Sequence, residues 1–187
     1  LPSEANITTA AGDVGVFQST GSNTVQCVSY TRADGTSLVG ANKSMYLVAL
    51  HRTDGEVDSQ STGRFLSMAD AATKQNHAIF AVPSDFSAIG NLYCIMRPTA
   101  TADMYSEFSA AAWADTDSIV GDTDSIAVTT YAQTANVMNF IDVSAMIDGL
   151  TLGADHVVSL KHVRQGSHAS DTLDGNAQAY GWLFTYT

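Results

Sequence analysis

The last twelve residues of the chain, 176–187, constrain the fold more than any other stretch. Large side chains stand at every second position and alternate with mostly small ones: Tyr180, Trp182, Phe184 and Tyr186 alternate with Ala179, Gly181, Leu183 and Thr185. A period of two is that of a β-strand, and aromatic residues suit its pleated surface. A segment this apolar needs neighbours on both sides. We therefore expect an interior strand whose aromatic face is buried in a core; the alternative for these rings is a stacking platform for sugars or bases.

Shorter segments of strand character recur along the rest of the chain, separated by turn signals such as Asp34-Gly35 and Asp148-Gly149. Residues 56–63 are expected as a polar loop, and 140–146 mix the periods of helix and strand. Without amphipathic helices between strands, a parallel α/β fold is excluded. The pattern predicts an all-β fold, an antiparallel β-sandwich of the jelly-roll type with about eight strands. The segments expected as strands are 25–30, 45–50, 76–82, 92–96, 103–113, 125–130, 156–164 and the closing aromatic segment.

Residues 1–24 differ in composition from the rest, being rich in Thr, Ser, Gly, Ala and Asn. We expect an extended N-terminal arm over 1–24 and the sandwich over 25–187. Such an arm has too few apolar groups for a core of its own, so it gains order against a partner, for example a second copy of the chain. Its expected anchors in this assembly are Ile7, Val14, Val16 and Phe17.

The charge of the chain narrows its partners. Nineteen acidic and eight basic residues give a net charge of −11. Phosphate backbones and anionic membrane surfaces both require a basic surface, so we expect no direct nucleic-acid or membrane partner. No apolar run approaches the roughly 18 residues that a membrane-spanning helix needs.

The two cysteines, Cys27 and Cys94, both lie in apolar, strand-like segments. They are either two buried thiols or a disulfide, and their spacing does not decide between these. No Cys-x-x-Cys motif is present, which excludes a zinc knuckle or a thioredoxin-type site.

A short repeat, Asp-Thr-Asp-Ser-Ile, begins at residues 115 and 122. Calcium prefers a shell of oxygen ligands, so this acidic loop is the best metal candidate, although it lacks the pattern of an EF-hand. The alternative is a solvated acidic loop without a metal. No other cofactor is expected. The candidate calcium ligands are Asp115, Asp117, Asp122 and Asp124.

Signals for catalysis are missing from the sequence. No Gly-x-Ser-x-Gly, Walker or Gly-x-Gly-x-x-Gly motif occurs. The histidines are scattered; on one extended strand, His156 and His162 would lie about 20 Å apart, too far to share a metal ion. We therefore expect a protein that is not an enzyme.

Three segments of the second half each resemble a segment of one known module. They are residues 78–86 (Ala-Ile-Phe-Ala-Val-Pro-Ser-Asp-Phe), 150–155 (Leu-Thr-Leu-Gly-Ala-Asp) and 164–173 (Arg-Gln-Gly-Ser-His-Ala-Ser-Asp-Thr-Leu). With the closing Tyr-Thr, residues 76–187 resemble a jelly-roll module of tailed-phage virion proteins such as head fibres, tail fibres and decoration proteins. The loop at 164–173 is the most specific part. The chain departs from the module at Gly153-Ala154 and at Gly181-Trp182. The resemblance implies a structural protein and carries over no catalytic residue.

These observations predict a structural subunit of a virus particle, a phage capsid, decoration or fibre protein, that self-assembles or binds other virion proteins. Two alternatives stay open. One is an extracellular filament subunit that donates its arm as a strand. The other is a carbohydrate-binding β-sandwich for surface glycans, suggested by Trp113, Trp182 and the tyrosines. In each case the expected location is the virion or the extracellular space.

Overall fold

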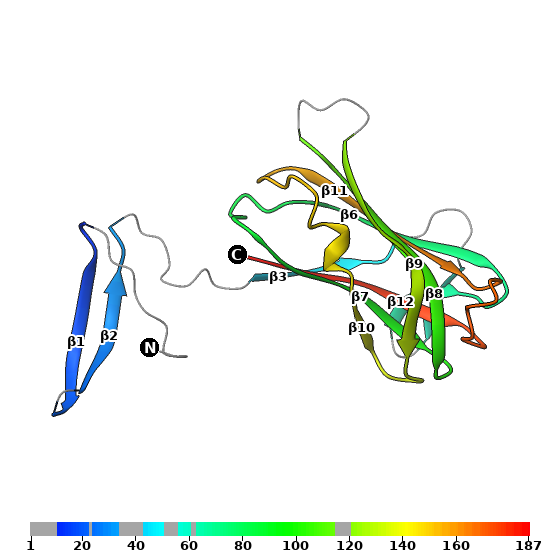
Figure 1. Cartoon of the computed structure of the whole chain (residues 1–187), viewed down its shortest axis with the longest axis horizontal. Helices are drawn as coiled ribbons and strands as arrows, with labels where there is room; N and C mark the ends of the chain where they lie inside the picture. The colour runs from blue at the N-terminus through cyan, green and yellow to red at the C-terminus, as the bar shows by residue number, and fades with distance from the viewer. Residues whose placement is uncertain (1–10, 23, 34–42, 51–55, 61–62, 115–120) are drawn as a thin grey trace. The chain divides into compact units, whose positions relative to one another are not determined.

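The computed structural model describes the whole chain except residues 1–10, 23, 34–42, 51–55, 61–62 and 115–120. It divides the chain into two compact units, Leu1–Ala41 and Asn42–Thr187. Figure 1 shows β-strands in both units. Apart from the short 3₁₀ turn η2 (Ser144–Met146), the regular structure of the described residues is β-strand. None of these residues forms a helix long and apolar enough to cross a membrane.

The larger unit is a sandwich of two antiparallel sheets. The first, called here the six-stranded sheet, has the order β10–β7–β12–β5–β4, with β3 also paired to β12. Its strands are β3 (Lys43–Val48), β4 (Glu56–Gln60), β5 (Gly63–Met68), β7 (Ile89–Pro98), β10 (Asn139–Asp142) and β12 (Ala177–Tyr186). The four-stranded sheet has the order β6–β11–β8–β9. Its strands are β6 (Thr73–Ala81), β8 (Ala102–Trp113), β9 (Asp122–Gln133) and β11 (Val157–Gln165).

The chain passes from one sheet to the other at almost every connection. From β5 to β12, the hairpin between β8 and β9 is the one connection that stays within a sheet. The order β5–β12–β7–β10 therefore faces β6–β11–β8–β9, which is the jelly-roll arrangement. The predicted antiparallel jelly-roll sandwich is confirmed.

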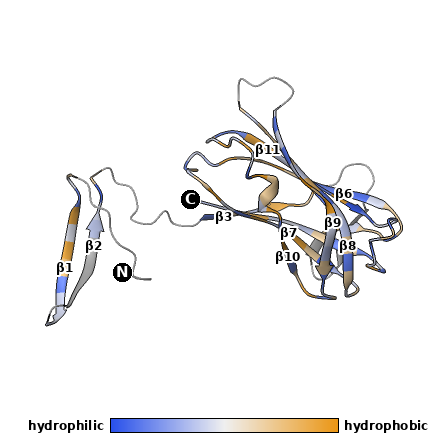
Figure 2. Cartoon of the chain, viewed as in Figure 1, coloured by the Kyte–Doolittle hydropathy of each residue, from blue (hydrophilic) through white to orange (hydrophobic). Residues whose placement is uncertain are grey.

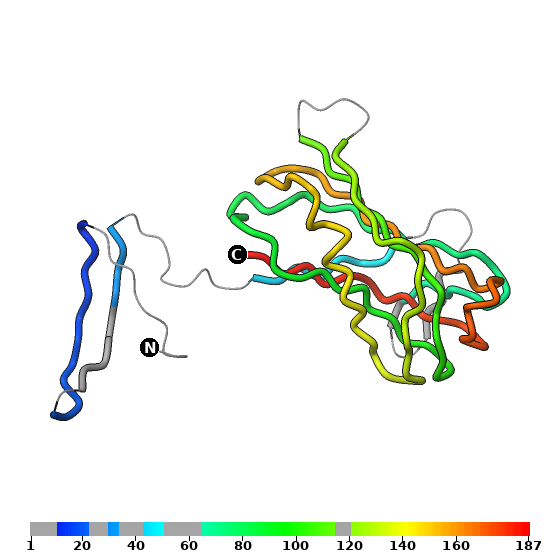
Figure 3. Tube along the Cα trace, in the orientation of Figure 1, coloured from blue at the N-terminus to red at the C-terminus, as the bar shows by residue number. Residues whose placement is uncertain are grey.

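The C-terminal strand β12 lies in the interior of its sheet, as its sequence predicts. It pairs with β7 on one side, and with β5 and then β3 on the other; Figure 3 shows it between the paths of β3 and β7. Trp182 and Phe184 are completely buried between the sheets. The core interpretation of these rings is confirmed, and Trp182 is not available as a sugar platform.

Tyr180 does not share the face of the other aromatic residues of β12. An irregularity in the pairing with β7 falls between Ala179 and Gly181, and it moves Tyr180 to the outer face, where it packs against Phe65. The sequence period predicts the opposite orientation because a bulge adds one residue to a strand without changing its composition. A side chain at position 181 would collide with the carbonyl oxygen of Leu47, so glycine fits this bulge.

One other segment differs from its expected structure, and two ambiguous ones are resolved. Residues 56–60, expected as a polar loop, form strand β4 at the edge of the six-stranded sheet. The ambiguous segment 140–146 divides between β10 and η2. The segment 103–113, for which strand was preferred, is within β8.

The N-terminal unit contains a β-hairpin of β1 (Val14–Gly21) and β2 (Thr24–Thr31). The sequence instead suggests an extended arm to residue 24 and a sandwich strand at 25–30. The Asp13 carboxylate accepts hydrogen bonds from the Tyr30 hydroxyl (2.6 Å) and the Ala33 N–H (3.0 Å), which closes the open end of the hairpin. Of the expected anchors, Ile7 lies outside the described residues. The other three anchors lie on β1, a strand that Figure 2 colours as partly hydrophobic. Their side chains are largely exposed: Val14 by 63%, Val16 by 55% and Phe17 by 57%.

The two cysteines lie in different units of the chain. Cys94 is a free thiol, fully buried on the inner face of β7, and burial raises its pKa. Cys27 lies on β2 of the other unit. The side chain of Cys27 lies outside the part of the chain that the structure describes, so the choice between two thiols and a disulfide stays a prediction.

Candidate functional site

The four-stranded sheet has a buried face and an open face. Along β6, β8 and β11 the side chains alternate between buried and more exposed positions, because successive residues of a strand point to opposite sides. The strand register aligns the outward residues in rows across the sheet. The first row runs from β6 to β9 through His77, Lys161, Ser109 and Ser125.

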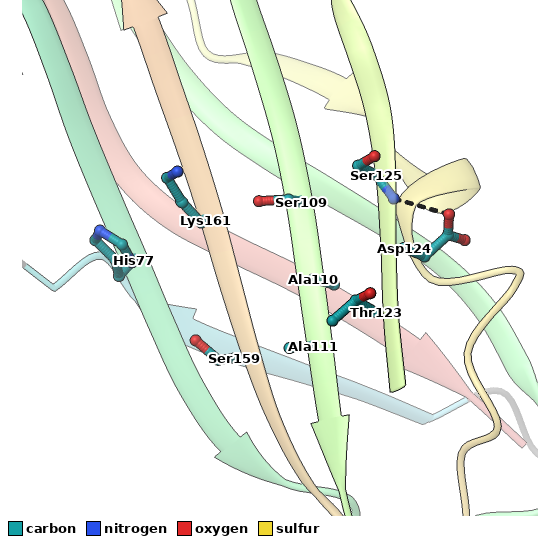
Figure 4. A pocket seen from close by; sticks show the side chains of 9 residues that line it. All are labelled: His77, Ser109, Ala110, Ala111, Thr123, Asp124, Ser125, Ser159 and Lys161. Carbon is teal, nitrogen blue, oxygen red and sulfur yellow. Dashed lines mark hydrogen bonds between the residues drawn. The ribbon is translucent and has the colours of Figure 1, made fainter. Parts of the chain in front are cut away.

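A second row lies two residues away from the first, later along β6 and β8 and earlier along β9 and β11; it contains Ile79, Ser159, Ala111 and Thr123. On β8 and β9 both rows consist of short side chains, whereas the longer ones, those of His77, Lys161 and Ile79, lie on β6 and β11. A hollow of about 490 Å³ results. All residues of the two rows except Ile79 line it, and Ala110 and Asp124 also belong to its lining. In Figure 4 its side chains come from all four strands of the sheet.

The chemistry of the hollow is that of hydrogen bonding. Each hydroxyl both donates and accepts, and the Lys161 ammonium carries three donors. Ligand sites for apolar molecules are lined mostly by apolar side chains, which this hollow is not. It suits a ligand with many hydroxyl groups. The hydroxyls come from Ser109, Thr123, Ser125 and Ser159.

Larger groups border the hollow along β8. Trp113 follows Ala111 on the outward face and lies opposite Val157 of β11. Glu107 precedes Ser109, and its carboxylate lies 4.0 Å from Lys161 Nζ. Both of these charged side chains are about 40% exposed (39% and 41%), so solvent screens their attraction.

The outer face of the six-stranded sheet has a different character. Leu183 of β12 lies opposite Tyr93 of β7 on one side and Tyr46 of β3 on the other. The rings of Tyr93 and of Phe140 on β10 form a T-shaped contact with their centroids 6.3 Å apart. Tyr46 and Phe140 are about half exposed (53% and 54%). This apolar surface is a second place where a ring-shaped ligand can stack.

The loop that carries the strongest resemblance to virion proteins is folded around Arg164. Nε and Nη2 of Arg164 donate to the two carboxylate oxygens of Asp171 (3.0 and 2.7 Å), and both side chains are fully buried. The remaining guanidinium donors reach the carbonyls of Met68, Leu173 and Gly175 at 2.6–2.9 Å. All five donors have partners, so Arg164 and Asp171 hold the loop in place and leave no donor for a ligand.

A second buried polar group lies in the core of the sandwich. His162 Nδ1 lies 2.8 Å from Asn76 Nδ2, its Nε2 lies 3.0 Å from Ser106 Oγ, and its ring stacks on Phe108. With Asn76 donating to Nδ1, the neutral imidazole donates from Nε2 to Ser106. Burial and the positive charge of Arg164 lower the pKa of His162 to about 3. A serine beside a histidine is also the arrangement of a nucleophile and its base. Here the side chains of Asn76, Ser106 and His162 are at most 1% exposed, so a substrate does not reach them from solvent.

The acidic loop proposed as a calcium site is described in part. Asp122 accepts a hydrogen bond from the N–H of Thr151 (2.7 Å), and Asp124 accepts from those of Gly149 (2.8 Å) and Ser125 (2.7 Å). Both carboxylates thus tie β9 to the segment after η2. Asp115 and Asp117 lie outside the described residues. Among the residues that the structure describes, no three of His, Cys, Asp or Glu gather to hold a metal ion; calcium binding stays a prediction.

The sequence does not reveal the hollow. Its residues are separated by up to 84 positions, His77 to Lys161, and the register that brings them together is a property of the sheet. The available signal is the alternation within each strand, where small polar residues such as Ser109 and Ser159 stand between buried ones. Of the residues proposed for carbohydrate binding, Trp113 borders the hollow and Trp182 lies in the core.

Comparisons with known proteins give no family for this chain. No family model matches it, and no curated protein matches it. Among solved structures, the family 11 carbohydrate-binding module of Clostridium thermocellum, in complex with a β-1,3-1,4-mixed-linked tetrasaccharide, is 12% identical over 94% of this chain and 96% of its own, with a TM-score of 0.40.

Two further solved structures share a similar likeness. The module TmCBM61, in complex with β-1,4-galactotriose, is 6% identical over 79% of this chain and 85% of its own, with a TM-score of 0.36. The enzymatically active domain of tailspike protein 4 of bacteriophage CBA120 is 13% identical over 78% of this chain and 19% of its own, with a TM-score of 0.37. At these scores the jelly roll is assigned from the strand order of the chain itself.

Proposed function

We propose that this protein is a carbohydrate-binding β-sandwich that acts without catalysis and takes a glycan in the hollow on its four-stranded sheet. The observation that carries the proposal is the alignment of two rows of short, mostly hydroxyl-bearing side chains across four strands. Three strand spacings of about 4.8 Å make these rows roughly 14 Å long. A glycan lying across them meets hydroxyl groups along its length.

The chemistry of the lining supports binding rather than turnover. Glycosidases use a pair of carboxyl groups on either side of the scissile bond. Among the described side chains that line the hollow, Asp124 is the one carboxylate. It is engaged by the N–H groups of Gly149 and Ser125. Its partner across the strands, Ala110, is buried, which places Asp124 on the inward side of β9.

Filling the hollow tests the proposal. Ser159→Tyr puts a large side chain in the middle of the second row, whereas Ser44→Tyr makes the same change at an exposed position of β3 outside the hollow. We expect the full chain to bind a subset of sugars on a glycan array, Ser159→Tyr to lose this binding, and Ser44→Tyr to keep it. Unchanged binding by Ser159→Tyr, or no sugar bound by the unmodified chain, contradicts the proposal.

A second function, as a self-assembling structural subunit of a virus particle, is supported by the N-terminal hairpin. Three apolar side chains of β1 are more than half exposed, those of Val14, Val16 and Phe17. They belong to a two-stranded sheet, and such a hairpin is marginally stable by itself. The two functions are compatible, because the hairpin and the hollow belong to different units. Detection of the protein by mass spectrometry in purified particles is the expected result, and its absence from particles contradicts this function.

A further inference from the structure

The hollow has a positive side in an otherwise acidic protein. Lys161 lies opposite His77 on one neighbouring strand and opposite Ser109 on the other. Figure 4 shows the side chains of Lys161 and His77 on the same side of the hollow, with those of Ser109 and Ser125 across from them. The chain has 8 Lys and Arg residues against 19 Asp and Glu residues. An ammonium group in the first row is therefore a local exception to the charge of the molecule.

The ammonium of Lys161 is placed to bind an anionic partner. Its distance of 4.0 Å from the Glu107 carboxylate is too long for a hydrogen bond. Exposed pairs of this kind contribute little to stability and are screened by salt. An incoming anion that makes hydrogen bonds with Lys161 replaces a weak contact by a stronger, charge-assisted one.

The carboxylate that lines the hollow, that of Asp124, is turned away from Lys161. Asp124 makes its hydrogen bonds with the N–H groups of Gly149 and Ser125, and in Figure 4 its side chain points away from those of Lys161 and His77. An anion beside Lys161 would thus meet the hydroxyl of Ser109 in the same row. The Lys161 ammonium and the Ser109 hydroxyl are thus the donors on this side, and the Glu107 carboxylate, 4.0 Å from Lys161 Nζ, is the competing anion.

Resting on the glycan-binding function proposed above, we propose that the ligand of the hollow is an acidic saccharide, whose carboxylate or sulfate group binds Lys161 in the first row. The sugar hydroxyls then pair with the serine and threonine hydroxyls of both rows. The net charge of −11 repels anions in general. A preference for an acidic sugar therefore has to come from the site.

Calorimetric titration of the full chain with three sugars of equal length tests this. The probes are an oligogalacturonate, a sulfated galacto-oligosaccharide and the neutral galacto-oligosaccharide. We expect at least one acidic probe to bind about tenfold more tightly than the neutral one. The acidic probe that binds identifies the group as carboxylate or sulfate.

Three variants locate the preference. Lys161→Gln is expected to abolish it, and Glu107→Gln to strengthen binding of the acidic probe because a competing carboxylate is removed. Lys43→Gln is the matched control, with the same change of charge on β3, where Lys43 pairs with Asp85; it should keep the preference. Thermal melting of each variant verifies that the sandwich is folded.

Two results overturn the inference, and they differ in what else they affect. Equal binding of neutral and acidic probes, with Lys161→Gln unchanged, overturns the acidic ligand and leaves glycan binding in place. An acidic preference that persists in Lys161→Gln also overturns it. If neither these probes nor any sugar of a glycan array binds, the proposed function fails together with the inference.

Discussion

Asp171 neutralises the most deeply buried charge of the sandwich, the guanidinium of Arg164. Removing one partner of a buried ion pair leaves the other charge without compensation, and such changes cost about 3–5 kcal/mol. We therefore expect Asp171→Asn to lower the free energy of unfolding by an amount in this range, measured by denaturant titration. Asp85→Asn breaks the exposed pair with Lys43 and should cost far less. Equal losses in the two variants would show that the Arg164 loop does not depend on its ion pair.

His162 gives the sandwich a dependence on pH. Its pKa is about 3 in the folded protein against about 6.5 when unfolded, so the unfolded chain binds one more proton between these values. The contribution of the neutral histidine is complete above pH 6.5 and is lost as the pH falls toward 3, by about 1.4 kcal/mol per pH unit. We expect His162→Gln to have a shallower slope of unfolding free energy against pH over 3.5–6. Parallel slopes would mean that His162 does not titrate on unfolding.

At the level of elements, β12 organises the core. The Phe184 ring lies 5.2 Å from that of Phe80 and 5.6 Å from that of Tyr186. Phe184→Ala leaves a cavity between the sheets and should cost about 3–5 kcal/mol of unfolding free energy. Replacement of the exposed Phe140 by alanine is the matched control and is expected to cost much less. A loss below about 1 kcal/mol for Phe184→Ala would contradict the buried position of this ring.

The elements also show what the sequence could predict. Alternation of side chains gave the strands of the second half, such as β8 and β11, because each has one face in the core. Strand β4 was missed because its sequence, Glu-Val-Asp-Ser-Gln, is too polar to read as a strand, although it pairs with β5 along an edge. The bulge at Gly181 and the hairpin of β1 and β2 depend on pairing partners, which composition does not specify. The hollow was missed for the same reason, since it exists only once the strands are in register.

At the level of the whole molecule, the two proposed functions fall on different units of the chain. The Leu1–Ala41 unit presents the exposed side chains of β1, and the Asn42–Thr187 unit contains the sandwich and its hollow. Assembly through the first unit must overcome the repulsion between chains of net charge −11. We therefore expect association of the full chain to increase at high salt, where this repulsion is screened.

Deleting residues 1–41 separates the two functions. The remaining sandwich should stay folded, because among the described residues its core is built from positions after 41. Its self-association, measured by sedimentation at matched concentrations, should be weaker than that of the full chain. The double change Val16→Ser and Phe17→Ser should have the same effect without shortening the chain. Undiminished association in both variants would exclude the hairpin as an assembly element.

Nuclear magnetic resonance mapping is the sharpest test of the proposed binding of a glycan across the outward rows of the four-stranded sheet. The full chain is titrated with a sugar that it binds, and the backbone amide shifts are followed. We expect the largest shifts on β6, β8, β9 and β11 around Ser109, Ser159 and Lys161. Shifts centred instead on Tyr46, Tyr93 and Phe140 of the six-stranded sheet would contradict it and place the sugar on the aromatic surface.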